Sequence, residues 1–153
     1  MKCTLISVGE MKNSHLKKVA GDYRGRLEHH LQVEEKHVRK VRRGTAKKVK
    51  QKEGQRLLGA VNEGSLVVAM TEGGKQMNSV EWARQINEWM VHGRQEVSFL
   101  IGGAHGLSRQ VRTSADRRWS LSALTFPHEV AMMLMWEQLY RALTIIRKEP
   151  YHK

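Results

Sequence analysis

The sequence has very little cysteine and proline. Its one cysteine, Cys3, excludes a disulfide within the chain and a cysteine-based metal cluster. No metal site is expected, and Cys3, set in an apolar stretch, is expected to be a small buried hydrophobic residue. Only two prolines occur, and no linker is evident. The 153 residues therefore predict a single domain over 1–153.

Long hydrophobic runs are missing as well. No apolar run approaches the roughly 20 residues that are needed to cross a bilayer. The apolar stretch CTLISV at residues 3–8 is too short to be a signal peptide. These absences predict a protein with no membrane partner and a cytoplasmic location.

Acidic residues are scarce relative to basic ones. The chain has 27 Lys and Arg against 15 Asp and Glu, a net charge of +12. Such an excess favours a polyanionic partner, most often nucleic acid, with an anionic membrane surface or plain solubility as alternatives. Ten of the basic residues fall between Lys36 and Arg56, where Glu53 is the only acid. We expect a mobile basic loop leading into a helix, which either contacts phosphates or is a solvated charge run.

Hydrophobic periodicity predicts strands and helices in alternation. Apolar strands are expected at 3–8, 65–70 and 96–103, a more polar one at 33–38, and a strand or extended loop at 119–124. Helices are expected at 13–30, from 46 onward, and at 79–92, 108–115 and 127–147. In the helix at 79–92, one plausible apolar face consists of Val80, Ala83, Ile86 and Met90. This order predicts an α/β domain with a largely parallel sheet.

Three loops of glycine and small residues follow predicted strands, at 70–74, 102–106 and 121–126. In open α/β sheets, ligands bind at the carboxyl ends of the strands. The loops are nearly free of carboxylates, so their backbone groups suit an adenine edge and a ribose better than a metal. The spacing of Gly102, Gly103 and Gly106 fits a dinucleotide loop only loosely, because that loop should follow the first strand. A phosphate-rich cofactor is therefore not favoured.

Several motifs together closely resemble those of one bacterial family. They are VSFLIGGAHGLS (97–108), WSLSALTFPHEVAMMLMWEQLYRA (119–142) and PYHK (150–153), with LISVG (5–9), KEGQRLL (52–58) and GGK (73–75). The family is the large-subunit ribosomal RNA methyltransferase H family of the SPOUT superfamily, and the resemblance spans the whole chain. Many relatives have Pro-Glu where this chain has Ala104 and His105, so the role of His105 stays open.

The resemblance implies a fold, a reaction and partners. Members transfer a methyl group from S-adenosylmethionine to N3 of a pseudouridine in 23S rRNA, on the assembled 70S ribosome. They are homodimers, and their C-terminal half forms a trefoil knot that holds the cofactor. The implied cofactor contacts are Met70, Gly102, Leu121, Ser122, Ala123, Leu124, Thr125 and Phe126.

Four residues are candidates for the chemistry. The imide N3–H must lose its proton, which suits a histidine with a near-neutral pKa, either His128 or His152. Arg141 could stabilise the developing anion, and Tyr151 could stack on a base. Each has a plainer alternative: His128 would only satisfy backbone groups of the first helical turn, and Arg141 would only pair with Glu137.

Chain ends are usually frayed, but the resemblance favours a tail that orders over the active site, of its own or of a partner subunit. The run VAMMLMW at 130–136 is apolar on all sides, which predicts either plain core or a homodimer interface. Two rival functions remain at this point. One is a non-catalytic ribosome-binding module, and the other is a Rossmann-like nucleotide-dependent enzyme.

Overall fold

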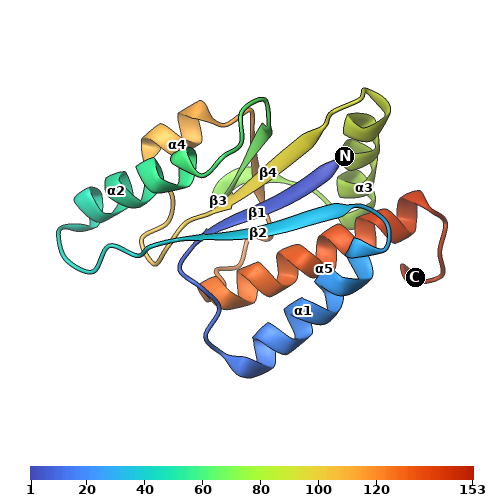
Figure 1. Cartoon of the computed structure of the whole chain (residues 1–153), viewed down its shortest axis with the longest axis horizontal. Coiled ribbons are helices and arrows are strands. Elements are labelled where there is room, and N and C mark those ends of the chain that lie inside the picture. The colour runs from blue at the N-terminus through green and yellow to red at the C-terminus, as the bar shows by residue number, and fades with distance from the viewer.

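The computed structural model describes all 153 residues as alternating strands and helices (Figure 1). In chain order these are β1 (Lys2–Val8), α1 (Ser14–Glu28), β2 (Gln32–Val38), α2 (Ala46–Gly59), β3 (Leu66–Gln76), α3 (Ser79–Val91), β4 (Glu96–Ile101), α4 (Arg109–Ser114), β5 (Arg117–Ser120) and α5 (His128–Ile146). The five strands form one parallel sheet in the order β2-β1-β4-β3-β5. The predicted α/β class is confirmed, while the trefoil knot stays a prediction.

Helices cover both faces of the sheet. Helices α1, α3 and α5 pack on one face, with α5 lying between the other two, and α2 and α4 pack together on the opposite face (Figure 1). Successive residues of β1 alternate between the two layers, as strand geometry requires. Cys3 and Leu5 enter the larger core, whereas Ile6 and Val8 enter the smaller one. Burial also raises the pKa of the Cys3 thiol to about 12, as expected for a buried residue that acts as a small hydrophobe.

Side-chain caps fix the start of four helices. In each, a polar side chain just before the helix accepts a hydrogen bond from the backbone N–H three residues on, which satisfies one of the free donors of the first turn. These caps are Asn13, Thr45, Asn78 and Ser108. At α3 the side chain of Glu81 also reaches back to the N–H of Asn78, which completes a capping box.

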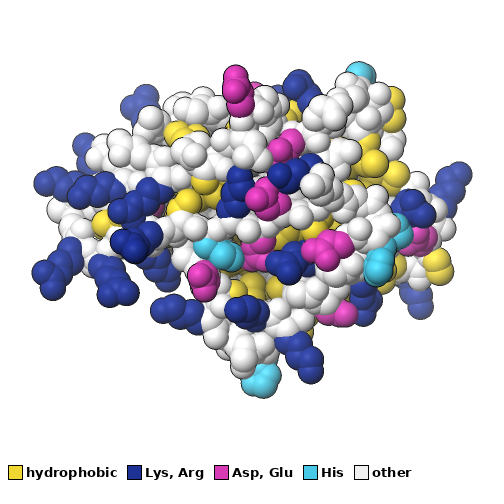
Figure 2. Space-filling model, viewed as in Figure 1, with side chains coloured by type: hydrophobic (Ala, Val, Ile, Leu, Met, Phe, Trp, Pro, Cys, Tyr) yellow, Lys and Arg dark blue, Asp and Glu magenta, His cyan; other side chains and the backbone are white.

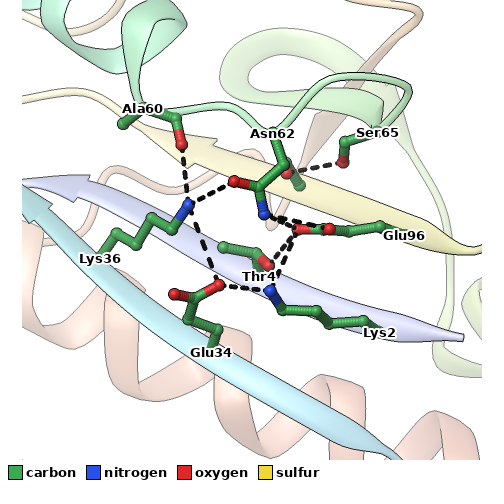
Figure 3. A network of polar contacts seen from close by, with 9 residues as sticks. Lys2, Thr4, Glu34, Lys36, Ala60, Asn62, Ser65 and Glu96 are labelled. Atoms are coloured by element: carbon green, nitrogen blue, oxygen red, sulfur yellow. Dashed lines mark hydrogen bonds and ion pairs between the residues drawn. The ribbon is translucent and has the colours of Figure 1, made fainter.

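A polar network closes the amino-terminal end of the sheet on the α2 side (Figure 3). Lys2 pairs with Glu34 at 2.5 Å, and the Thr4 hydroxyl donates to Glu96 at 2.6 Å. Asn62 donates to the same Glu96 carboxylate and accepts from Lys36 at 2.8 Å. Every strand residue named here lies on the same face of the sheet. Nearer the carboxyl ends of the strands this face becomes apolar, and α2 and α4 cover it there. One end of the sheet is thus tied by ion pairs, and the loops at the other end remain available for a site.

Two sequence predictions are wrong in detail. Residues 71–76 continue β3 instead of forming a turn, with a register shift between Met70 and Lys75. Gly74 permits this, because a Cβ there would lie 2.4 Å from the backbone carbonyl carbon of Trp119 on β5. The strand segment expected at 119–124 begins at Arg117 and ends at Ser120, and the loop starts there.

The buried face of α3 is also rotated from the predicted one. It consists of Trp82, Ala83, Ile86 and Trp89, while Val80 and Met90 are 43% and 37% exposed. Trp89 stacks on Trp119 with ring centroids 5.1 Å apart, and Trp82 lies 4.7 Å from the same ring. The two indoles bury more apolar area than Val80 and Met90 would, so they decide the orientation of the helix.

Candidate active site

A cleft of about 740 Å³ opens where the carboxyl ends of β3 and β4 meet the loop after β5. Residues of all three predicted loops line it, although residues 70–73 belong to β3. Its walls include residues 70–73, 101–107, 120–122, 124 and 126–128. Pockets of this size hold small-molecule ligands in proteins generally.

Most of the predicted cofactor residues line this cleft. They are Met70, Gly102, Leu121, Ser122, Leu124 and Phe126. Ala123 and Thr125 belong to the same loop but do not line the cleft. The Thr125 hydroxyl instead donates to Glu72 at 3.1 Å, which ties the loop to the distal part of β3. The loop lies at the cleft, but the sequence could not tell which of its side chains face inward, and the cofactor contacts stay a prediction.

The glycine loop after β4 is closed tightly upon itself. The N–H of Gly106 donates to the carbonyl of Gly103 at 2.9 Å. A Cβ on Gly102 would lie 2.6 Å from the backbone carbonyl carbon of Gly106, so no other residue fits there without a shift of the loop. Because the glycines carry no side chains, a ligand in the cleft can approach their backbone closely.

A buried carboxylate supports the glycine loop from below. Glu53 of α2 is only 4% exposed, and its Oε1 accepts the N–H of Val41 at 3.0 Å. Its Oε2 is buried without a hydrogen-bond partner and would be 2.7 Å from a Cβ on Gly103. Glu53 thus connects the basic segment to the glycine loop. The sequence marked it only as the sole acid in a basic run.

His128 stands in the wall of the cleft at the start of α5. Its Nε2 is buried and has no hydrogen-bond partner. Burial lowers the pKa of His128, and the nearby charge of Lys40 lowers it further, while the backbone carbonyls of Gly102 and Gly9 act in the opposite sense. At neutral pH the imidazole is therefore uncharged and able to accept a proton.

The neighbouring residue Glu129 has a structural role of its own. The carboxylate of Glu129 accepts the N–H groups of Lys12 and Asn13, so it anchors the start of α5 to the segment before α1. These hydrogen bonds lower the pKa of Glu129. No side chain caps the first turn of α5, and the ring of His128 lies beside the backbone carbonyls of Gly102 and Gly9 with its Nε2 buried and without a hydrogen-bond partner.

The other catalytic candidates gather at the far end of α5. Arg141 donates from Nη2 to Glu137 Oε1 at 2.6 Å, which raises the pKa of Arg141, and its guanidinium lies over the ring of Tyr151 at 4.7 Å. The Tyr151 hydroxyl donates to the same Glu137 oxygen at 3.0 Å and lies 3.2 Å from the Tyr23 hydroxyl, and burial with these contacts raises the pKa of Tyr151. His152 Nδ1 is 3.4 Å from Arg141.

This far-end cluster does not line the cleft of its own chain. Arg141 lies roughly 20 Å beyond His128 along the helix, at a rise of 1.5 Å per residue. The pairing of Arg141 with Glu137, which the sequence offered as the plain alternative, is present. It also holds the guanidinium against Tyr151, so the C-terminal residues turn back onto α1 and α5 and away from the cleft.

Known proteins are similar in sequence to this chain along its full length. Residues 1–152 match the family described as "Predicted SPOUT methyltransferase". Curated proteins named "Ribosomal RNA large subunit methyltransferase H" match over the whole of both chains, at 44% identity in Gemmatimonas aurantiaca and 36% in Carboxydothermus hydrogenoformans. The chain belongs to this SPOUT methyltransferase family. A third relative of the same name, from Gloeobacter violaceus, is 39% identical over 99% of each chain.

Two solved structures share the fold of this chain. A probable methylase family protein from Haemophilus influenzae aligns over 99% of this chain and 70% of its own, with a TM-score of 0.52 and 13% identity. A probable methyltransferase from Bordetella pertussis aligns over 93% of this chain and 95% of its own, with a TM-score of 0.51 and 10% identity. At such low identity these likenesses support the fold alone.

Sequence reasoning missed several cleft residues of this SPOUT methyltransferase. The cleft is also lined by Lys40, Lys50, Glu72 and Arg112. Glu53 does not line it but lies against the glycine loop. Lys40 and Lys50 belong to the basic segment, but only the fold shows that this segment reaches the cleft. No three His, Cys, Asp or Glu side chains converge as a metal site would require, and none of the helices is both long and apolar enough to span a bilayer.

Proposed function

We propose that this SPOUT methyltransferase transfers a methyl group from S-adenosylmethionine to N3 of a pseudouridine in 23S rRNA, on the assembled 70S ribosome. The proposal rests on one observation above the others. A histidine with a lowered pKa, whose buried Nε2 has no hydrogen-bond partner, stands in the wall of a strand-end cleft, next to the loops that would hold the cofactor. The names of the full-length relatives point to the same substrate class. The enzyme would act in the cytoplasm, where its ribosomal substrate is found.

The cleft suits S-adenosylmethionine in its shape and chemistry. Met70, Ile101 and Leu107 provide apolar wall, and the glycine loop presents backbone groups for an adenine edge. Glu72 provides a carboxylate that could accept hydrogen bonds from ribose hydroxyls. Met70, Gly102 and the loop Leu121–Phe126 would hold the cofactor, which supplies the electrophilic methyl group.

His128 is the residue we assign to proton removal. Methyl transfer needs the lone pair of the pseudouridine N3, so the imide proton must leave, and the neutral imidazole of His128 can accept it. Such general-base catalysis typically contributes about 10²–10⁴-fold to a rate. The remaining acceleration would come from the walls of the cleft, which hold donor and acceptor in contact and in line.

Arg141, Tyr151 and His152 would serve the cleft of a partner subunit in a homodimer. Within one chain they lie too far from His128 to act together with it. The outer side of α5 offers a surface for a partner, because Val130, Met133 and Leu134 are only half-buried although the helix is apolar. In the dimer, Arg141 would stabilise the anion that forms on the base, and Tyr151 would stack on it.

The basic segment, residues 36–56, would hold the ribosome through phosphates. Arg42, Arg43, Lys47 and Lys48 are exposed and form no ion pair, and basic side chains gather over α2 and the loop before it (Figure 2). Replacing these four with Glu should weaken ribosome binding and flatten its dependence on salt. Unchanged binding of 70S ribosomes by this variant would contradict the assignment.

The reaction itself is tested by tritiated methyl transfer from S-adenosylmethionine. The substrates are 70S ribosomes that lack the modification, isolated large subunits and protein-free 23S rRNA. Label in the rRNA of the 70S sample alone is the expected result. Ribosome binding with no label in any sample, together with no cofactor binding by calorimetry, would leave a non-catalytic ribosome-binding module.

A further inference from the structure

A second hollow of about 610 Å³ lies beside the cleft. It is bounded by the distal part of β3, the end of α4 and the start of β5, and it shares Gly73 and Arg112 with the cleft. Four of its lining residues are basic, namely Lys75, Arg112, Arg117 and Arg118. We refer to it as the cationic hollow.

These four charges are not neutralised within the chain. Lys75, Arg112 and Arg118 form neither an ion pair nor a side-chain hydrogen bond, and Arg117 donates only to the backbone carbonyl of Asp116. Asp116 is the one acid in the lining, and its carboxylate accepts the N–H of Val67 at 2.7 Å. Four exposed cations thus surround one hollow that contains a single carboxylate, and no ion pair forms between them.

The lining indicates what kind of anion fits. Ala115 is the only apolar side chain in the hollow, and no aromatic ring faces it, so a base has nothing to stack on. Arginine forks bind phosphate oxygens in a bidentate manner, and phosphate contacts need no base recognition. The chemistry therefore suits the phosphodiester backbone of a nucleic acid better than a free nucleotide.

The position of the hollow relates it to the path of a substrate strand. The basic segment follows β2 at one edge of the sheet, whereas the hollow is built from β3 and β5 at the other edge. The glycine loop after β4 lies between them, and Lys40 and Lys50 extend the basic segment to the cleft. Two cationic surfaces therefore flank the cleft.

We propose that the cationic hollow binds rRNA phosphates on one side of the target nucleotide, while the basic segment holds the strand on the other side. The strand would then cross the mouth of the cleft, with the target base turned inward. This inference rests on the proposed function, and it assigns to Lys75, Arg112, Arg117 and Arg118 a role that neither the motifs nor the cofactor loops suggest.

The test compares two double variants that lose the same charge. Lys75→Gln/Arg118→Gln alters the hollow without touching a residue that lines the cleft, and Arg84→Gln/Arg94→Gln removes two cations that line neither cavity. Binding to 70S ribosomes is measured by co-sedimentation across a range of KCl concentrations. S-adenosylmethionine binding is measured by calorimetry on the same proteins.

We expect the hollow variant alone to lose ribosome affinity, by on the order of 10- to 50-fold near 0.1 M salt, with a salt slope shallower by about 1–2. Its cofactor affinity should be unchanged, and Lys75→Arg/Arg118→Lys should restore the slope.

Equal behaviour of the hollow and control variants would overturn the inference alone. Lost affinity with an unchanged slope would assign the hollow to an acidic protein surface and overturn the RNA assignment. Wild-type protein that bound neither cofactor nor ribosomes would overturn the proposed function and this inference together.

Discussion

The two ends of α5 carry catalytic candidates of opposite character. At the amino-terminal end, His128 is partly buried in a cleft wall, has a lowered pKa and has an Nε2 without a hydrogen-bond partner. At the other end, Arg141 and Tyr151 share the carboxylate of Glu137 and are held in place by it. The first end has a cavity with an unused base, and the second has an ordered cluster with no cavity of its own.

This difference explains why a single chain looks incomplete. Arg141 and Tyr151 provide a cation and an aromatic ring that suit an anionic base. Arg141, however, lies about 20 Å from His128 along the helix, at a rise of 1.5 Å per residue. In the proposed homodimer, the far-end cluster of one subunit would serve the cleft of the other. The four predictions that follow test whether the two ends differ in this way.

The largest effect is expected at the cleft. His128→Ala should lower kcat by about 10²–10⁴-fold, because proton removal from N3 loses its base. Calorimetry should show S-adenosylmethionine still bound. His92→Ala, an exposed histidine at the end of α3, is the matched control and should leave kcat unchanged. Equal rates for His128→Ala and the wild type would remove His128 from the mechanism.

A smaller loss is expected at the far end. A chain ending at Pro150 lacks Tyr151 and His152 but retains the pair between Arg141 and Glu137. Its kcat/KM should fall by about 5- to 150-fold, which corresponds to the roughly 1–3 kcal/mol of a base stacked on an aromatic ring. Removal of Lys153 alone is the control. A truncated chain with full activity would show that the tail has no role.

Gly102→Ala should damage cofactor binding and leave the far-end cluster intact. The new Cβ would press on the backbone of Gly106 at 2.6 Å, and overpacking of this kind costs about 1–3 kcal/mol. S-adenosylmethionine affinity should fall roughly 5- to 100-fold by calorimetry. Cofactor affinity equal to that of the wild type would place the cofactor elsewhere.

The pH dependence gives the smallest expected effect. Because the pKa of His128 is below its usual 6.5, the acid limb of kcat should have its midpoint below pH 6.5. Lys40→Met should move that limb to higher pH, since the charge of Lys40 lowers the pKa, whereas Arg94→Gln should not move it. The unfolded chain binds this proton near pH 6.5 and the folded chain only at lower pH, so folding stability should decline as the pH falls below about 6.5. An acid limb that Lys40→Met leaves in place would separate Lys40 from the base.

Local signals in the sequence predict most of the fold. Apolar strands that end in glycine and polar caps such as Asn13 and Asn78 are recognised from a few neighbouring residues, and each of these elements is present. The errors arise where distant contacts decide. Trp119 on β5 packs against both tryptophans of α3 and so decides which face of α3 is buried. The close approach of Gly74 to Trp119 lets β3 continue through a segment whose sequence is typical of a turn.

The site was predictable to a similar extent. The segments at 70–74, 102–106 and 121–126 could be placed together because parallel strands end at the same side of a sheet, although the first proves to be part of β3. The positions of Lys40, Glu53 and the cationic hollow could not be predicted, because they depend on how the basic segment and β5 fold toward the cleft. The separation of His128 from Arg141 also needed the structure, because both lie in one continuous motif of the sequence.

The most direct test of a shared active site mixes two impaired proteins. His128→Ala supplies an intact tail, and the chain ending at Pro150 supplies an intact cleft. After unfolding and refolding together, about one quarter of wild-type methyl transfer to 70S ribosomes should return, because half of the dimers are mixed and each holds one complete site of two. If each chain instead used its own tail, no mixed dimer would hold a complete site. Activity no greater than the sum of the separate variants would contradict the account.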